Sequence, residues 1–437
     1  MTDKTQNPHV QVGVFDLNGQ LRGKRLPAKK LGTVLKDGFR MPISIMGIDI
    51  WGRDIPNSEL VFESGDGDGY CIPTGRGPLT ISTAKEPTVL VPCTFLNEDK
   101  TLFIGDPRQA LAQIVDRYKA LGLTVVAATE MEFYLTDPDA VYGTAQTAPI
   151  NQEFEVLEAV DTLDLHEPFL NAVYKECEAW DVPADAVISE GGTGQFEINL
   201  NHVADPLKAA DDAMLFKRIV RSVARDQGLA ATFMAKPFGD RAGNGLHVHF
   251  SVLDEDGNNI FANGTDEGSD NLKHAVAGCL DMMPASMAIF APHYNSYRRF
   301  AADSHAPSAV GWGYENRTAA IRIPGGPDVA RRIEHRVAGG DANVYLILTA
   351  ILGAALHGIE TKAVAPDPIK GDAYAAGLEK LPNSWEAALD IFEASEAIGV
   401  IFDPILKSIY LKAKRQELER FETEVSTFEY RTYLNTA

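Results

Sequence analysis

The sequence predicts an α+β protein in which a small β-rich amino-terminal module precedes a larger mixed α/β region. The chain has 437 residues, more than one ordinary hydrophobic core supports, and 45% of them are hydrophobic. Residues 9–104 contain short apolar runs separated by turn residues, which favours strands. Beyond Asp106, helical periodicity alternates with strand-like runs, as in α/β and α+β domains.

The amino-terminal module begins with a predicted hairpin. Residues 12–17 have the composition of a strand, and Asn18-Gly19 is a hairpin signal. Glycine-rich turns follow. The segment Asp66-Gly-Asp68-Gly resembles the start of a calcium loop, but it lacks the glycine and the terminal glutamate that such a loop requires. It is therefore predicted to be a turn.

The larger region contains clear helix and strand signals. Asp106 and Pro107 suit the N-cap and first position of a helix that runs to about residue 121. Runs rich in β-branched and aromatic residues predict strands near Glu130 and His247. Further helices are predicted over residues 167–180, 211–227, 270–290 and 342–362.

The two predicted strands contain glutamates and histidines at alternate positions. Residues two apart in a strand point to the same face, so Glu130 projects with Glu132, and His247 projects with His249. Adjacent carboxylates repel each other unless a cation lies between them. Taken alone, the glutamate pair is more typical of a solvated strand face, and the histidine pair is a better but ambiguous signal of metal binding.

More charged residues join this set. Glu190 and Glu197 lie in apolar or glycine-rich segments, where burying an unpaired charge would cost several kcal/mol. Glu334 lies within an arginine run that contains Arg331, Arg332 and Arg336. Carboxylates and an imidazole without a thiolate favour Mg²⁺ or Mn²⁺ over zinc, and guanidinium groups suit phosphate. The set predicts metal ions that hold a polyphosphate, and hence an enzyme that uses ATP.

Composition limits the partners and the location of the protein. Acidic residues outnumber basic residues by 61 to 40, and the net charge of −21 argues against nucleic acid. This charge mildly favours cationic substrates, although a soluble acidic surface explains it equally well. No run approaches the ~20 apolar residues of a membrane span, and the polar start is not a signal peptide. Four widely spaced cysteines predict reduced thiols in a cytoplasmic protein.

Seven segments resemble, in order and spacing, the glutamine synthetase family over nearly the whole chain. They are TEMEFYL, GQFEINL, ATFMAKP, GNGLHVHFS, NSYRRF, NRTAAIRIP and RRIEHRVAGGDAN. The amino-terminal DLNGQLRGKRLP is most similar to the γ-glutamylputrescine synthetase branch, which joins glutamate to a polyamine. The resemblance implies a β-grasp-like domain over residues 1–105 and a glutamine synthetase/guanidino-kinase-type α/β catalytic domain over residues 106–437.

The resemblance implies two or more Mg²⁺ or Mn²⁺ ions and assigns their ligands. The metal that faces the amino-acid substrate would be held by Glu132, Glu190 and Glu197. The metal that bridges the ATP phosphates would be held by Glu130, His247 and Glu334.

The same resemblance assigns roles in substrate binding. Arg299 and Arg336 match arginines that hold the carboxylate of glutamate and the transferred phosphoryl group, and Gly243 matches a glycine whose backbone approaches glutamate. Arg317 matches a catalytic arginine placed on the γ-phosphate. The residues implied to contact the nucleotide are His249, Ser251, Arg322 and Arg332.

The implied reaction has two steps. The γ-carboxylate of glutamate attacks the terminal phosphate of ATP, and an amine then displaces phosphate from the resulting γ-glutamyl phosphate. Free alkylamines are protonated at pH 7, so some group must accept a proton before the amine attacks.

Two residues differ from the ammonia-using members of the family. Six residues after Arg299, those enzymes carry a glutamate that helps to deprotonate ammonium, whereas this chain has His305. Ala242 replaces a glutamate-binding asparagine. Both changes disfavour ammonia as the second substrate. His305 is either the acceptor of the amine's proton near neutral pH or a mobile surface residue of its loop.

The amino-terminal domain is expected to serve a neighbouring subunit. Asp49 matches the position from which the family supplies an aspartate to the ammonium site of that neighbour. Trp51 either offers a cation–π face to an alkylammonium, worth roughly 0.5 to 2 kcal/mol, or lies in the core of the β module. Shared sites require an oligomer, and the resemblance implies a homododecamer of two hexameric rings.

The leading hypothesis is an ATP-dependent ligase that joins glutamate to putrescine, another polyamine, or a small alkylamine such as ethanolamine or isopropylamine. Trp312, Tyr314 and His305 are candidates for lining the amine entrance. The alternatives are a glutamine synthetase that uses ammonia and a non-catalytic, ring-forming structural relative, which would be expected to have lost metal ligands.

The short segment 370–382 predicts no regulatory adenylylation, with Tyr374 as the only candidate for it.

Overall fold

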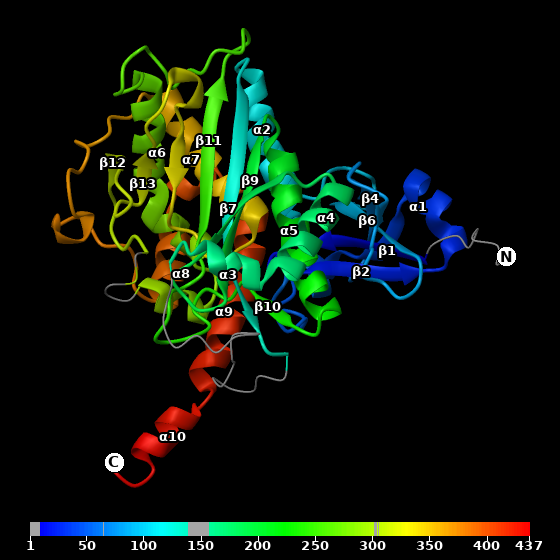
Figure 1. The fold of residues 1–437 in the computed structure, drawn as a ribbon. Coiled ribbons are helices and arrows are strands. Elements are labelled where there is room, and N and C mark those ends of the chain that lie inside the picture. Colours follow the sequence, from blue (N-terminus) through cyan, green and yellow to red (C-terminus); the bar gives the residue numbers. More distant parts are fainter. Residues whose placement is uncertain (1–8, 64, 139–156, 301–303, 305) are drawn as a thin grey trace.

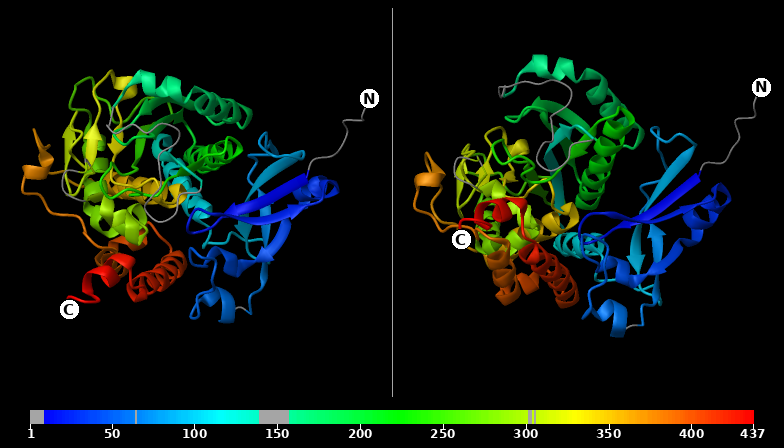
Figure 2. Two further views of the ribbon diagram at one scale, coloured as in Figure 1. Left: turned by 60° about the horizontal axis from the view of Figure 1, so that its bottom comes forward. Right: turned by 90° about the horizontal axis from the view of Figure 1, so that it is seen from below.

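The computed structural model describes residues 9–63, 65–138, 157–300, 304 and 306–437. An amino-terminal sheet lies beside a larger sheet that is packed against helices, and the chain ends in helices at the edge of the molecule (Figure 1). The two further views in Figure 2 show the amino-terminal sheet at one side of the helix-covered region. The predicted α+β class is confirmed.

The amino-terminal sheet has the strand order β2-β1-β6-β4-β3, with β5 beside β6. The predicted hairpin is present, because β1 and β2 pair in antiparallel fashion and Gly19 takes a positive φ of 68° in the turn. The predicted turn at Asp66 ends at Gly67, whereas Asp68 and Gly69 already belong to strand β4 because they pair with β3. The elements are β1 (His9–Phe15), β2 (Leu21–Leu26), α1 (Leu31–Asp37), β3 (Phe39–Pro42), β4 (Asp68–Pro73), β5 (Leu79–Thr80) and β6 (Thr88–Leu96).

The larger sheet has the order β12-β13-β14-β11-β7-β9-β8, with β10 beside β7. Its central strands β7, β9 and β11 pair in antiparallel fashion, and β14 continues this pattern beside β11. The strands are β7 (Thr124–Thr136), β8 (Ala184–Ser189), β9 (Gln195–Val203), β10 (Ala230–Thr232), β11 (Leu246–Leu253), β12 (Trp312–Tyr314), β13 (Ile321–Ile323) and β14 (Ile333–His335).

The helices follow the sequence signals closely. The Asp106 side chain caps α2 by accepting a hydrogen bond from the backbone N–H of Arg108, and α6 has the predicted bounds. The helix predicted from residue 211 begins earlier, because Asp205 caps it and Pro206 takes its first position. The helices are α2 (Pro107–Ala120), α3 (Val160–Leu165), α4 (Glu167–Ala179), α5 (Pro206–Asp226), α6 (Asp270–Phe290), α7 (Val344–Thr361), α8 (Trp385–Ala394), α9 (Pro404–Thr423) and α10 (Thr427–Tyr433).

Helix α7 forms much of the core. It is long and apolar enough to cross a membrane by composition, but 78% of it is buried inside this fold. Glycines let α6 approach it closely, because a Cβ atom at Gly278 would lie 2.1 Å from the carbonyl oxygen of Ala354. We therefore interpret α7 as a core helix.

Polar contacts join the two parts of the chain. Arg76 of the amino-terminal sheet pairs with Asp212 of α5, and the Ser82 hydroxyl donates to Glu176 of α4. The Asn343 side chain donates to the carbonyl oxygen of Asp16 at 2.9 Å. The predicted domain boundary at residues 105/106 falls in the connection between β6 and α2.

Candidate active site

Strand pairing brings the sequence-predicted ligands together on the larger sheet. Strands β7, β9, β11 and β14 are neighbours, so residues far apart in the sequence face one another. The facing pairs are Glu130 and His247, Glu132 and Glu197, and Glu334 and His249. The alternation expected in each strand therefore places these side chains in one region.

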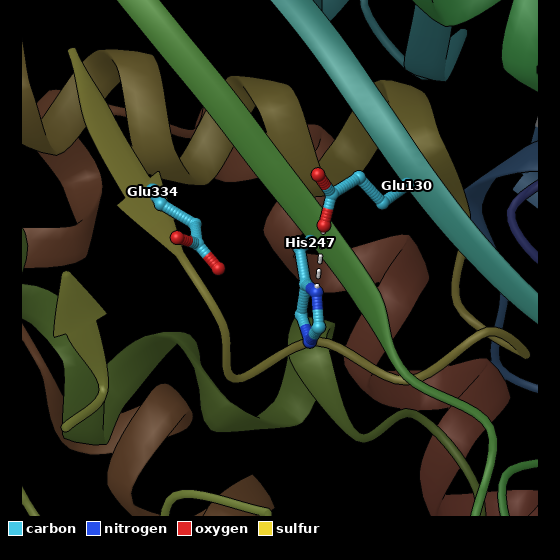
Figure 3. A group of neighbouring side chains, drawn as sticks. All are labelled: Glu130, His247 and Glu334. Atoms are coloured by element: carbon cyan, nitrogen blue, oxygen red, sulfur yellow. Dashed lines mark hydrogen bonds and ion pairs between the residues drawn. The ribbon is translucent and has the colours of Figure 1, made fainter. Parts of the chain in front are cut away.

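The first group contains Glu130, His247 and Glu334, which have ligand atoms within 4.8 Å of one another. Figure 3 shows these side chains converging from β7, β11 and β14. The Nδ1 atom of His247 lies 3.2 Å from an Oε atom of Glu130. This is the group predicted to hold the metal ion that bridges the phosphates.

The second group contains Glu132 and Glu197, and it also includes His247. Glu190 lies near enough for its charge to act on Glu197, although it falls outside the 4.8 Å group. The backbone N–H of Gly245 donates to Glu132 at 2.8 Å and orients its carboxylate. The structure therefore places the two predicted groups side by side, with His247 between them.

The electrostatics of the second group favour a bound cation. Burial, followed by the negative charges of nearby glutamates, raises the pKa of Glu197 to about 9 and that of Glu190 to about 7. Burial also raises the pKa of Glu132. A divalent cation would remove this repulsion, and its preferred oxygen ligands are the ones present. The side chains thus fit Mg²⁺ or Mn²⁺.

The first group carries its negative charge without added cations. Burial acts to raise the pKa of Glu130, but hydrogen bonding to His247 and contact with His249 outweigh it and lower the pKa. Burial is likewise outweighed at Glu334, where His247 and Arg336 lower the pKa to about 2. Burial lowers the pKa of His247, which favours the neutral imidazole that a metal ion requires.

Two of the predicted arginines bind the carboxylate of Glu334. The Nη1 atom of Arg322 lies 2.7 Å from one oxygen of Glu334, and Arg336 pairs with the other. In addition, Arg322 reaches Glu315. These contacts gather guanidinium groups next to the first metal group, where the phosphates of a nucleotide are expected.

Another predicted arginine is connected to the metal group through His249. Arg332 donates from Nε to Nδ1 of His249 at 3.1 Å, and Nε2 of His249 lies 2.9 Å from Glu130. Ser251 follows two residues later on the same strand and is buried. The predicted nucleotide residues are therefore continuous with the metal ligands.

Arg299 is buried, and its guanidinium donates to the carbonyl oxygens of Val337 and Ala338. Its charge also acts on Glu132. Gly243 makes room for it, because a Cβ atom at this glycine would lie 2.6 Å from Cγ of Arg299 and 2.7 Å from the carbonyl oxygen of Ala235. Glycine is required here by the close approach of the arginine stem.

Arg317 is exposed beside an open cavity of about 580 Å³ that it forms with residues 314–316 and 368–371. Tyr374 follows this segment, and the charges of Arg299 and Arg336 act on its hydroxyl. From the sequence, Tyr374 is a candidate only for modification. No local sequence signal indicated this position near two arginines that are predicted to bind substrate, since the short helix Ala373–Ala375 lies outside the seven motifs.

Sequence reasoning also missed two amides on β9. The side chain of Gln195 donates to Glu132 at 3.3 Å and to the carbonyl oxygen of Gly243 at 3.0 Å. Asn199 donates to Glu130 at 3.4 Å. Both residues lie two positions from Glu197, so the strand period placed them on the same face and could have identified them.

Asp49 is separate from this group. It is 1% exposed, and its carboxylate accepts hydrogen bonds from the Arg53 backbone N–H at 2.8 Å and from the Gln416 side chain at 2.9 Å. Within this chain it anchors a loop, and its action on a neighbouring subunit stays a prediction. His305 lies outside the described residues.

Two interpretations of aromatic residues were wrong. Trp51 is 44% exposed and packs against Phe421 of α9, so it is not in the core of the β module. The Arg53 guanidinium already lies over its ring. Trp312 is 2% exposed and donates from its indole to the carbonyl oxygen of Pro366, so it does not line an open entrance.

This fold, with two adjoining carboxylate groups that share His247, is that of a carbon–nitrogen ligase. Residues 104–433 match the family described as glutamine synthetase, catalytic domain. The chain belongs to the glutamine synthetase family.

Individual relatives narrow the comparison. The γ-glutamylputrescine synthetase of Escherichia coli (strain K12) is 35% identical, over 98% of this chain and 92% of that protein. The glutamate–isopropylamine ligase of a Pseudomonas species is 32% identical, over 98% of this chain and 95% of that protein. A solved GmaS/ADP complex covers 100% of both chains with a TM-score of 0.85 and 27% identity. The predicted resemblance is confirmed.

Proposed function

We propose that this enzyme joins the γ-carboxylate of glutamate to an organic amine at the expense of ATP. The observation that carries the proposal is the pair of adjoining carboxylate groups bordered by arginines. Support also comes from the relatives, which are named as ligases of putrescine and isopropylamine, and from the ADP complex of a similar structure.

The proposed chemistry assigns different tasks to the two sides of the site. Divalent cations held by the two carboxylate groups would neutralise charge on the phosphates. Arg322 and Arg336 lie next to the first group and orient the phosphate oxygens. Arg317 is exposed and free to approach the terminal phosphate. Arg299 and Gly243 bind the glutamate.

The second substrate is proposed to be an alkylamine, with putrescine as the leading candidate. Ala242 lacks the amide that ammonia-using relatives present to glutamate. The net charge of −21 attracts cations such as a polyamine, which carries more than one positive charge. Asp49 and His305 are the candidates for removing the amine's proton.

The family resemblance is the basis for proposing a homododecamer of two hexameric rings, and apolar surface on the carboxyl-terminal helices supports a contact between subunits. Helix α10 projects away from the body of the molecule (Figure 1). It exposes aromatic residues, including Phe428 at 80% exposure, Tyr430 and Tyr433. Such a patch on an otherwise acidic chain is typical of a protein–protein contact.

The test is phosphate release from ATP with glutamate and Mg²⁺ or Mn²⁺, comparing ammonium with putrescine, spermidine, ethanolamine, methylamine and isopropylamine. Selective turnover with one organic amine, with the amide confirmed by product mass, would support the proposal. Turnover with ammonium alone would identify a glutamine synthetase. Failure with every amine would contradict glutamate–amine ligation. Glu197→Gln serves as the inactive control, because it removes one expected metal ligand.

A further inference from the structure

A second cavity of about 580 Å³ lies between the amino-terminal hairpin and the larger sheet. Its walls come from the β1–β2 turn, from α5, and from the segments that contain His293 and Asp341. None of the described metal-binding or nucleotide-binding candidates lines it. Its volume is in the range of small-molecule sites, which is about 300 to 1,000 Å³.

Three basic residues of α5 line this cavity. They are Lys217, Arg218 and Arg221, and Arg221 follows the other two by four and three positions, so it neighbours each of them on the helix surface. Lys217 is only 6% exposed.

The partners of these three cations are neutral. Lys217 donates to the carbonyl oxygen of Ala342 at 2.7 Å, and Arg218 donates to the side-chain oxygen of Gln11 at 2.6 Å. The Arg221 guanidinium lies 5.2 Å from the centre of the Phe233 ring. Among the described residues, no carboxylate lies within the 4.0 Å ion-pair distance of any of the three.

The acidic residue in the cavity wall is Asp341, and it has other partners. One of its oxygens is 2.9 Å from Nδ1 of His293 and accepts from the Ser296 hydroxyl. Its remaining oxygen Oδ1 and the Nε2 atom of His293 are buried without hydrogen-bond partners among the described residues. The Oδ1 atom of Asp341 requires a hydrogen-bond donor and does not favour an anion. The opposite wall presents three basic side chains that pair with no carboxylate among the described residues, and this favours an anionic ligand there.

Lys217 shows the cost of the missing counter-charge. Burial, together with the charge of Arg221, lowers the pKa of Lys217 to about 7, while Asp341 acts weakly in the opposite direction. An ammonium group kept in such a place without an anion is destabilised. An anion between Lys217 and Arg221 would restore its full charge.

We propose that this cavity binds a small dianion, either a dicarboxylate or a phosphate group, with Lys217, Arg218 and Arg221 as its binding residues.

The test is calorimetric titration of the full-length protein with inorganic phosphate and with succinate, without ATP, metal ions or amine. Saturable binding is expected, and Arg221→Gln should weaken it at least about tenfold, equivalent to about 1.4 kcal/mol. Arg225→Gln is the matched control, since it removes the same charge one turn along α5 and does not line the cavity. Arg317→Gln should retain this binding, which separates it from anions held at the active site.

Three outcomes would overturn the proposal. The first is no saturable binding of either anion to the wild type. The second is equal binding by the wild type and Arg221→Gln. The third is a change of oligomer size in Arg221→Gln without any loss of anion binding, which would assign the cavity to a carboxylate of a neighbouring subunit. The titration uses no ligase substrates, so it is independent of the proposed function.

Discussion

Binding of Mn²⁺ to the wild-type protein is expected to release protons, because the second carboxylate group is partly protonated without a cation. The pKa values of Glu197 and Glu190 are raised to about 9 and about 7 by burial and by neighbouring carboxylates. A metal ion binds the ionised forms, so metal and protons compete for the same oxygens.

The size of the release follows from these pKa values. At pH 7.5, a carboxyl group with a pKa of about 9 is almost fully protonated, whereas one with a pKa of about 7 is protonated roughly one quarter of the time. About one proton per site should therefore leave on metal binding at pH 7.5, and close to two near pH 6. Because protons and the metal ion compete for the same oxygens, the apparent metal affinity should rise as the pH rises.

The assay is isothermal titration of Mn²⁺ in two buffers that differ in ionisation enthalpy, at the same pH. The difference in apparent enthalpy measures the protons released. Glu197→Gln should reduce the release at pH 7.5 to roughly a quarter of a proton and weaken metal binding at least about tenfold. Glu98→Gln changes an exposed carboxylate of the amino-terminal domain and should behave as wild type.

Release of no protons by the wild type, with an affinity that does not change between pH 6 and 8, would refute the reasoning. It would mean that Glu190 and Glu197 are already ionised before the metal ion binds. An unchanged release in Glu197→Gln would instead assign the proton to another group.

Three further predictions test individual residues. Gly243→Ala should raise the KM for glutamate at least about tenfold and lower the free energy of unfolding by about 1 to 3 kcal/mol, because the added Cβ would collide with Arg299. Gly239→Ala is the control, since its Cβ would meet open space, and it should change neither the steady-state kinetics nor the melting temperature. Arg317→Gln should lower kcat at least about a hundredfold with little change in melting temperature, because the side chain is exposed; unchanged kcat would remove it from the reaction. Asp49→Asn should lower the melting temperature, because the amide cannot accept both hydrogen bonds of the carboxylate equally well, and a large loss of kcat with unchanged melting would support its catalytic role.

The strand ligands were predictable from local spacing. Glu130 and Glu132 alternate with apolar residues, and His247 and His249 do the same, so the strand period alone placed each pair on one face. The structure then showed that β7 and β11 are neighbours, which brings Glu130 opposite His247. The same period places Gln195 and Asn199 on the face of Glu197. Neutral amides are poor indicators of a metal site, so nothing else in the sequence indicated their role.

The aromatic residues show where local reasoning failed. Trp51 lies among the short strands and turns predicted for the amino-terminal module, so a place in the core of that module was one of two interpretations. Its actual neighbour, Phe421, lies 370 positions later on α9. Trp312 is a candidate for the amine entrance in the sequence, but the chain returns after α7 and its indole donates to the carbonyl oxygen of Pro366. Both outcomes depend on which distant segments pack together.

The sequence by itself determined the α+β class, the main helices, the hairpin and the membership of the glutamine synthetase family, since these depend on periodicity, capping residues and ordered motifs. Only the tertiary structure decided that His247 belongs to both carboxylate groups, that Tyr374 lies near the arginines predicted to bind substrate, and that three basic residues of α5 line a separate cavity. Periodicity acts over a few residues, and it is encoded locally. Strand order and helix packing join residues hundreds of positions apart, and the pKa of a buried group depends on those neighbours rather than on its own segment.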